Sequence, residues 1–157
     1  LDYCEDLLFD FAMRDKFGPF AFAPDALAYF RPRGSLSAFY RQYFLYARGD
    51  GKAGLWLKRH IIRYGVYLIG FPALVAGSVL APAPVAWLSA GALLAGVALY
   101  LRAPYRRLRE LWQTTTLSGK VQAALWVPAI RATGDVAKML GFPAGLLWRA
   151  RRPSAGG

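Results

Sequence analysis

Two groups of side chains in this sequence have types and spacing that could do chemistry. The first is the acidic pair Glu5 and Asp6, at the start of a stretch with helical periodicity. The N-terminus of a helix keeps a carboxylate ionised, and an ionised carboxylate can act as a general base. The same pair also suits helix capping and compensation of the helix dipole. The pair taken alone leaves both interpretations open.

The second group is a set of cations around an aromatic segment. Five basic residues fall in this part of the chain: Arg31, Arg33, Arg41, Arg48 and Lys52. Arginine suits a diphosphate because its guanidinium can bind two phosphate oxygens at once. The same cations suit phospholipid headgroups equally well, since an apolar block follows them in the chain. A diphosphate site and a helix at a membrane surface are therefore both open.

Other kinds of site are excluded by the sequence. Cys4 is the single cysteine and His60 the single histidine, so there is no disulfide framework, no close Cys–His pair and no metal-ligand cluster. The segment GDGKAG, residues 49–54, lacks the GxxxxGKS/T spacing of a phosphate-binding loop and follows a predicted helix. We therefore expect no metal ligands within these residues.

The elements that position both groups can be read from periodicity and from capping residues. The pattern predicts a helix over residues 5–17 ended by Gly18 and Pro19, short strands over 20–23 and 26–30, and a helix over 36–48 that begins after Ser35 and ends at Gly49. Residues 49–54 are expected to form a loop. Both groups would then lie before the apolar part of the chain.

The middle of the chain has the composition of two membrane-spanning helices. Residues 64–101 contain no charged side chain, although the whole chain carries 20 Lys and Arg against 9 Asp and Glu. We expect one span over residues 61–80, a turn over 81–84 and a second span over 85–101. The basic residues lie on both flanks and none lies in the turn, which predicts that both flanks are cytoplasmic. A buried hairpin in a soluble core is the alternative.

Residues 111–152 remain apolar but are interrupted by charges. Arg131, Asp135 and Lys138 fall on one stripe of a helix, which is typical of amphipathic helices that lie in the membrane interface. A third span within residues 121–148 stays open. The last residues, 153–157, are expected to be disordered.

Two consecutive segments at the start of the chain, taken together, resemble a known family. The segments EDLLFDFAMRDKFGPFAFAPDALAYF (5–30) and RPRGSLSAFYRQYFLYARGDGKAG (31–54) resemble the second half of the catalytic domain of family 2 glycosyltransferases of the GT-A fold. The basic LWLKRHIIRY (55–64) and the tail RATGDVAKMLGFPAGLLWR (131–149) are similar to the membrane region of the same group. The resemblance implies an α/β fragment over residues 1–54 and an all-α membrane region with a transmembrane hairpin over 55–110.

The resemblance also implies an activity and roles for particular residues. The enzyme would transfer a sugar, with inversion, from a nucleotide-sugar donor to an acceptor hydroxyl at the cytoplasmic membrane face. Asp6 would be the general base with Glu5 beside it, and Arg48, Arg41 and Gln42 would bind the donor diphosphate or an acceptor phosphate. The nucleotide-binding half, with a DxD motif for Mg²⁺ or Mn²⁺, is expected upstream of Leu1, so that these residues alone are expected to be inactive.

The expected partners follow from this interpretation. They are a nucleotide sugar, membrane lipid, and a lipid-linked or polysaccharide acceptor in the cell or inner membrane. Nucleic acid is not expected, because the basic residues flank the apolar block. The competing hypothesis is a membrane hairpin protein without enzymatic activity, whose basic interfacial helices bind anionic lipid.

Overall fold

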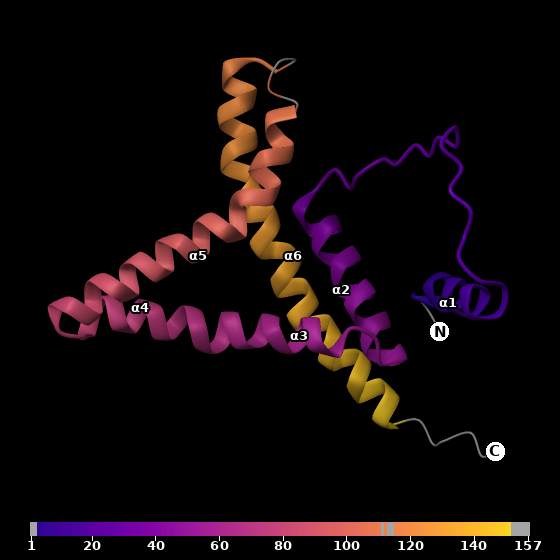
Figure 1. Cartoon of the computed structure of the whole chain (residues 1–157), viewed down its shortest axis with the longest axis horizontal. Helices are drawn as coiled ribbons and strands as arrows, with labels where there is room; N and C mark the ends of the chain where they lie inside the picture. The colour runs from indigo at the N-terminus through magenta and orange to yellow at the C-terminus, as the bar shows by residue number, and fades with distance from the viewer. Residues whose placement is uncertain (1–2, 111, 113–114, 152–157) are drawn as a thin grey trace. The chain divides into compact units, whose positions relative to one another are not determined.

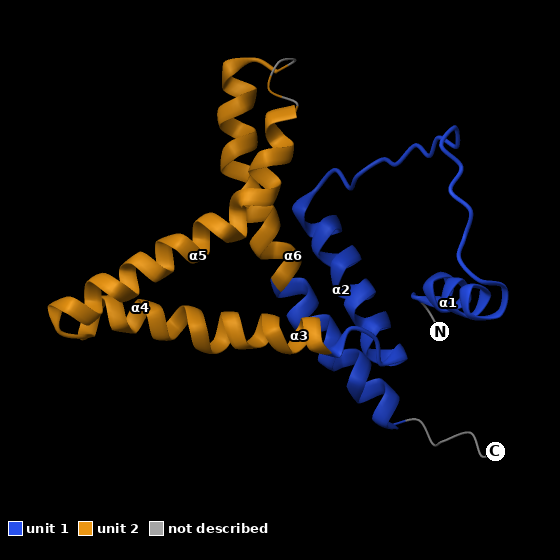
Figure 2. Ribbon diagram, viewed as in Figure 1, with its two compact units in different colours: residues 1–57, 136–157 blue, residues 58–135 orange. Residues whose placement is uncertain are grey.

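The computed structural model of the chain describes residues 3–110, 112 and 115–151 (Figure 1). Every regular element in this described part is a helix. In chain order these are α1 (Glu5–Phe17), α2 (Leu36–Ala53), α3 (Leu57–Tyr64), the π-helical turn η1 (Gly65–Gly70), α4 (Phe71–Leu80), α5 (Ala83–Glu110) and α6 (Leu117–Arg151). The chain divides into two compact units, which we describe separately (Figure 2). Unit 1 comprises residues 1–57 and 136–157, and unit 2 comprises residues 58–135.

The expected α/β fold is wrong, because the described residues form helices and no strand. The two predicted strands, residues 20–23 and 26–30, lie in an irregular segment between α1 and α2. Their side chains are exposed, Phe22 by 89% and Tyr29 by 96%. A strand is stable only when a neighbouring strand takes up its backbone hydrogen bonds, and no described segment does so here. The apolar composition of this segment is therefore not sufficient to make it a strand.

Helix α1 has the predicted bounds. Its first turn carries the acidic pair and its last turn carries Arg14 and Lys16, an order of charges that suits the helix dipole. Gly18 ends the helix with φ of 88°, and its N–H donates to the Arg14 carbonyl at 2.8 Å. A residue with a side chain would be strained at this positive φ. The predicted stop at Gly18 is therefore confirmed.

Helix α2 begins as predicted but ends later. The Ser35 hydroxyl caps the helix by accepting from the Ala38 N–H at 3.2 Å. The helix does not stop at Gly49, however, and the expected loop 49–54 is wrong. The segment continues as helix to Ala53, and Gly54 ends it with φ of 71°. Glycine costs about 1 kcal/mol in a helix, so tertiary contacts must hold this segment helical.

Those contacts are made in unit 1, where α2 packs closely on the C-terminal half of α6. The seam consists of small residues on both helices: Ala47 and Gly51 on α2, and Ala137, Gly141 and Gly145 on α6. A Cβ added to Gly51 would come within 3.0 Å of the Gly145 Cα, so the two backbones are in direct contact. Lys52 and Lys138 border the seam, with their ammonium groups over the rings of Trp148 and Tyr43 at 4.4 and 4.7 Å.

Unit 2 contains the apolar hairpin that the sequence predicts. The helical run Leu57–Leu80 and the helix Ala83–Glu110 are both long and apolar enough to cross a membrane. The turn is shorter than expected: Ala81 is extended, and α5 already includes Ala83 and Pro84. Proline fits the first turn of a helix because the missing N–H would have no helical partner there.

Pro72 disturbs the first apolar helix, because it has no N–H to donate to the Leu68 carbonyl. The disturbance takes the form of η1, a π-helical turn directly before the proline. At its end the Phe71 N–H donates to the Val66 carbonyl, five residues back. Such i to i+5 bonds are rare in proteins and usually occur as single turns within an α-helix.

The two hairpin helices pack closely only near their turn. A Cβ on Gly77 would lie 2.5 Å from the Ser89 Oγ, so the two helices approach closely at this glycine. Gly96 has nothing within 4 Å of an added Cβ, so the two helices are not in close contact at that glycine. Helices α4 and α5 separate from each other away from the turn, as Figure 2 shows within unit 2.

The C-terminal residues form one helix rather than several. Helix α6 runs from Leu117 to Arg151 and contributes to both units. In unit 2 its beginning is tied to α5 by the Tyr105 hydroxyl, which donates to the Ala124 carbonyl at 3.0 Å. Within the described residues, α6 is not among the helices that are long and apolar enough to span a membrane. The expected disordered tail, residues 153–157, lies outside the described residues.

Candidate functional site

The start of α1 is held against the end of α2. Tyr3 and Cys4 both have φ of 72°, which directs this short segment across α2. It crosses at Gly49, where an added Cβ would lie 2.6 Å from the Cys4 Sγ and 3.0 Å from the Tyr3 carbonyl oxygen. A second contact joins α1 to the residues after α2, because the Phe11 and Trp56 rings meet edge to face at 6.2 Å. The position of the acidic pair therefore depends on a glycine in the GDGKAG segment.

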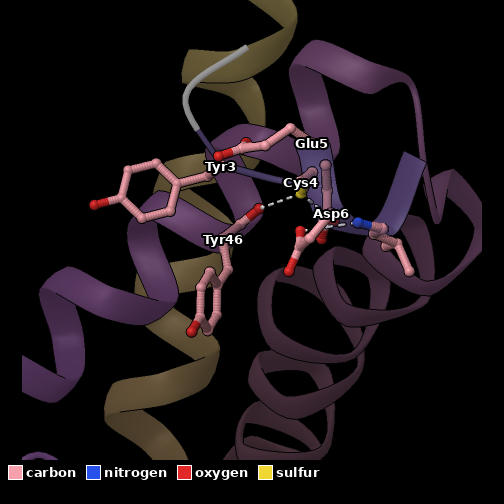
Figure 3. Close-up of a pocket in the computed structure, with 7 residues that line it drawn as sticks. Tyr3, Cys4, Glu5, Asp6 and Tyr46 are labelled. Atoms are coloured by element: carbon pink, nitrogen blue, oxygen red, sulfur yellow. Dashed lines mark hydrogen bonds between the residues drawn. The ribbon is translucent and has the colours of Figure 1, made fainter. Parts of the chain in front are cut away.

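A pocket of about 460 Å³ lies at this junction (Figure 3). It is lined by the residues that begin α1 and by one face of α2: Tyr3, Cys4, Glu5, Asp6, Leu7, Tyr46 and Asp50. Three of the side chains are carboxylates, and none is a cation. The pocket therefore suits a neutral hydroxyl or a cation, and it repels a diphosphate.

Asp6 is exposed at the mouth of this pocket, beside Glu5. Its Oδ1 accepts a hydrogen bond from the Leu7 N–H at 2.8 Å. A carboxylate fixed in this way at the first turn of a helix can accept a proton from a hydroxyl bound in the pocket. The same bond also satisfies one of the free N–H groups at the helix start.

Cys4 is not a candidate nucleophile. Its Sγ donates to the Tyr46 carbonyl at 3.7 Å and to Asp50 Oδ1 at 3.6 Å. Burial, followed by the nearby Asp50 carboxylate, raises the pKa of the thiol to about 12. The thiolate is the form that attacks substrates and binds metals, so Cys4 is inert at neutral pH.

The predicted site residues are only partly brought together. Glu5 and Asp6 line the pocket, whereas Arg41, Gln42 and Arg48 do not. The Gln42 amide reaches the neighbouring Tyr46 hydroxyl at 2.8 Å. Arg48 lies six residues after Gln42, which places it roughly 120° around the helix. Arg41 and Arg48 are seven residues apart and share one face of α2, so that only Gln42 is turned away from the two arginines.

Tyr46 and Asp50 were not identified from the sequence. Both belong to the pocket because α2 remains helical through residues 49–53. With that helix in place, Gln42, Tyr46 and Asp50 recur every four residues and share one face. The four-residue spacing was a usable signal, but the loop expected over GDGKAG removed Asp50 from it.

No group of three or more His, Cys, Asp or Glu side chains among the described residues could hold a metal ion.

A second polar cluster lies in unit 2, around Asp135. Asp135 Oδ1 accepts from Arg63 Nε at 2.9 Å, and Oδ2 accepts from the hydroxyls of Tyr100 and Tyr67 at 2.7 and 3.1 Å. Burial acts to raise the pKa of Asp135, but these hydrogen bonds outweigh it and lower the pKa overall. The sequence predicted Asp135 in a polar stripe at the membrane interface, whereas its carboxylate joins α6 to both hairpin helices.

Comparison of the chain with protein family models, with curated proteins and with solved structures gave no match.

Proposed function

We propose that this chain is the acceptor-side and membrane part of a glycosyltransferase, which transfers a sugar from a nucleotide-sugar donor to an acceptor hydroxyl. One observation carries the proposal. The two segments that resemble the family meet at one pocket, although Asp6 and Asp50 are separated by more than forty residues of sequence. Helical packing at Gly49 brings them together. This arrangement supports a shared site better than two independent helix ends.

Asp6 is the proposed general base. Displacement of a nucleoside diphosphate from a sugar requires removal of a proton from the incoming hydroxyl, and a positioned base contributes about 10²- to 10⁴-fold to such a step. Glu5 and Asp50 add negative charge around the same pocket, which favours a neutral acceptor over an anionic one. For the diphosphate of the donor, or for an acceptor phosphate, the proposed ligands are Arg48, Arg41 and Gln42 on α2.

The donor half of the site requires a further polypeptide surface. Large apolar side chains are exposed along α1 and the segment after it: Phe9, Phe17, Phe20, Phe22, Leu27, Tyr29 and Phe30. Clustered exposed apolar residues usually mark an interaction surface. We propose that they pack on the nucleotide-binding part of the enzyme. The Mg²⁺ or Mn²⁺ of the family has no fitting group of ligands among the described residues, so no role in metal binding is proposed for them.

The proposed membrane topology places both flanks of the hairpin in the cytoplasm. The cations on the flanks, Arg59, Arg102, Arg106, Arg107 and Arg109 among them, are exposed, and the turn at residues 81–84 carries none. Loops rich in Lys and Arg are retained on the cytoplasmic side. A cysteine introduced at Ala83 in a Cys4→Ser background should react with an impermeant thiol reagent only from outside the cell. Reaction from the cytoplasmic side would contradict the topology.

The test of the function compares two carboxylates of α1 in membranes that contain the complete gene product. Asp6→Asn should lower the rate of transfer from radiolabelled nucleotide sugars by at least about 100-fold, because it removes the base. Donor binding should be retained. Asp10→Asn is the matched control, since Asp10 is exposed one turn further along α1 and does not line the pocket. Residues 1–157 alone should show no transfer.

Two outcomes would contradict this proposal. Wild-type turnover by the Asp6→Asn protein would show that the acidic pair only begins a helix. Transfer by residues 1–157 alone would show that no separate donor half is needed.

The second candidate is a membrane hairpin protein without enzymatic activity. The bond from the Leu7 N–H to Asp6 favours it, because a helix start needs such a bond even where no chemistry occurs. In that case the complete gene product would transfer no sugar from any donor, with or without the Asp6 substitution.

A further inference from the structure

Unit 2 contains an apolar groove of about 460 Å³, within the range of about 300 to 1,000 Å³ that ligand sites usually have. Residues of η1, α4, α5 and α6 line it. Figure 2 shows that α4 and α5 move apart with distance from their turn. Its lining includes Val66, Phe71, Leu74, Leu93, Val97 and Pro128. Among the described residues that line it, Tyr67 and Tyr100 are the ones with a polar side chain. The wall therefore suits a hydrocarbon chain rather than a polar ligand.

Glycine keeps this groove open. Gly96 faces it from α5, and a Cβ at this position would meet no atom within 4 Å. Gly70 faces it from η1, where an added Cβ would make only an ordinary contact with the Gly65 carbonyl at 3.6 Å. Neither glycine is needed for close helix packing. Because they have no side chain, both leave space in the groove that a larger residue would fill.

One end of the groove is polar, with hydrogen-bonded tyrosines and the cation Arg131 beside them. The Tyr67 and Tyr100 hydroxyls bond to each other at 2.8 Å and to Asp135. The guanidinium of Arg131 lies over the Tyr100 ring at 4.7 Å, and its side chain is exposed. This places a positive charge next to an apolar space, as an amphiphile with an anionic head requires.

The position of Arg131 along the length of the hairpin also suits contact with a lipid phosphate. Tyr67 precedes the end of α4 by 13 residues, which corresponds to roughly 20 Å along a helix. Tyr100 follows the start of α5 by 17 residues, or roughly 25 Å. Both lie at the end of the hairpin that is opposite to the uncharged turn. That end carries the basic flanks and would meet the phosphate groups of one leaflet.

We propose that this groove binds one hydrocarbon chain of an anionic glycerophospholipid, with the lipid phosphate beside Arg131. The lipid comes from the leaflet that contacts the basic flanks. This site does not depend on the proposed glycosyl transfer, because none of its residues belongs to α1 or α2. Its occupation would fix the separation of α4 and α5.

The test uses the purified chain in nanodiscs of phosphatidylcholine that contain a small fraction of phosphatidylglycerol with a photoreactive acyl chain. Labelled peptides identified by mass spectrometry should come from the groove-lining parts of η1, α4, α5 and α6. Gly96→Phe should lower this labelling at least fivefold, because the ring occupies the groove. Gly91→Phe is the matched control: it lies on the same helix, has nothing within 4 Å, and does not line the groove.

The charge is tested by replacing the photoreactive phosphatidylglycerol with photoreactive phosphatidylcholine. The wild-type chain should prefer the anionic lipid, and Arg131→Gln should reduce this preference about fivefold, the effect of one cation near a charged membrane surface. Arg106→Gln controls for the general charge of the flanks. Circular dichroism should show that all variants keep their helical content.

Three outcomes would overturn the proposal. Equal labelling of the Gly96→Phe and Gly91→Phe variants would indicate bulk annular lipid only. Equal labelling by the two lipids in the wild-type chain would remove the role of Arg131. A change of oligomeric state with Gly96→Phe, without a change in labelling, would assign the groove to a second copy of the chain.

Discussion

In unit 1, α2 and the end of α6 meet along a seam of small residues, whereas in unit 2 the hairpin is joined to α6 by hydrogen bonds to Asp135. The two helices are close along the seam, with Ala47 and Ala137 fully buried. The hairpin instead leaves an apolar groove beside its polar cluster. The difference indicates two kinds of stability. Direct backbone contact holds α2 against α6 in unit 1. In unit 2, a few hydrogen bonds to Asp135 hold the two hairpin helices to α6 and leave a groove between them.

The largest effect is expected from removing the centre of the polar cluster. Asp135→Ala should lower the free energy of unfolding by about 3 to 5 kcal/mol, because it leaves a largely buried Arg63 without its carboxylate. The Arg63 and Asp135 side chains are only 18% and 14% exposed. Thermal unfolding in detergent, followed by circular dichroism, would measure the loss.

The double variant Arg63→Met/Asp135→Ala is the control for this prediction. It should recover part of the stability, since the unpaired charge is gone. If Asp135→Ala unfolds at the wild-type temperature, the cluster does not hold unit 2 together, and the contrast between the two units fails.

A smaller effect is expected from widening the seam of unit 1. Gly145→Ala would place a Cβ 2.8 Å from the Lys52 nitrogen and 2.9 Å from the Gly51 Cα, so the two backbones must move apart. We expect a loss of about 1 to 3 kcal/mol. Gly91→Ala, which meets no atom within 4 Å, should be neutral or slightly stabilising. The same thermal assay applies, and equal effects of the two substitutions would show that the seam is not close-packed.

The smallest effect concerns the contact that positions the acidic pocket. The raised pKa of Cys4 predicts that iodoacetamide at pH 8.5 alkylates the folded chain about tenfold or more slowly than the unfolded chain. The pKa of the folded thiol exceeds that of the unfolded one, so this contribution to stability is present below about pH 9 and is lost as pH rises toward 12. Alkylation at the rate of the unfolded chain would mean that Cys4 is not held between α2 and Asp50.

The elements that were predicted correctly carry their signals locally. Gly18 after an apolar helical stretch ends α1, and Ser35 begins α2, because each satisfies backbone groups of its own helix. The hairpin was predictable for a similar reason, since its length and lack of charge are properties of a continuous stretch. These local signals do not depend on tertiary contacts with the rest of the chain.

The wrong predictions concern segments whose structure depends on contacts with residues far away in the sequence. Gly49 and Gly51 were expected in a loop, yet they are helical because Cys4 and Phe142 pack against them. That error removed Asp50 from the site. The strands expected over residues 20–23 and 26–30 have no described partner strand to pair with. A carboxylate such as Asp135 looks like part of a surface stripe until the elements that bring Arg63 and Tyr100 to it are known.

The π-helical turn η1 changes the direction in which side chains point along the first hairpin helix. Its i to i+5 bond encloses one residue more than an α-helical bond, which offsets the phase of the helix by roughly 100°. The residues before the turn and those after it therefore follow separate angular registers. Arg63 can point toward Asp135 while Leu74 points into the groove. Deletion of a single residue here would restore a regular α-helix and turn α3 by about 100° relative to α4. Arg63 could then no longer reach Asp135 while Leu74 still lined the groove.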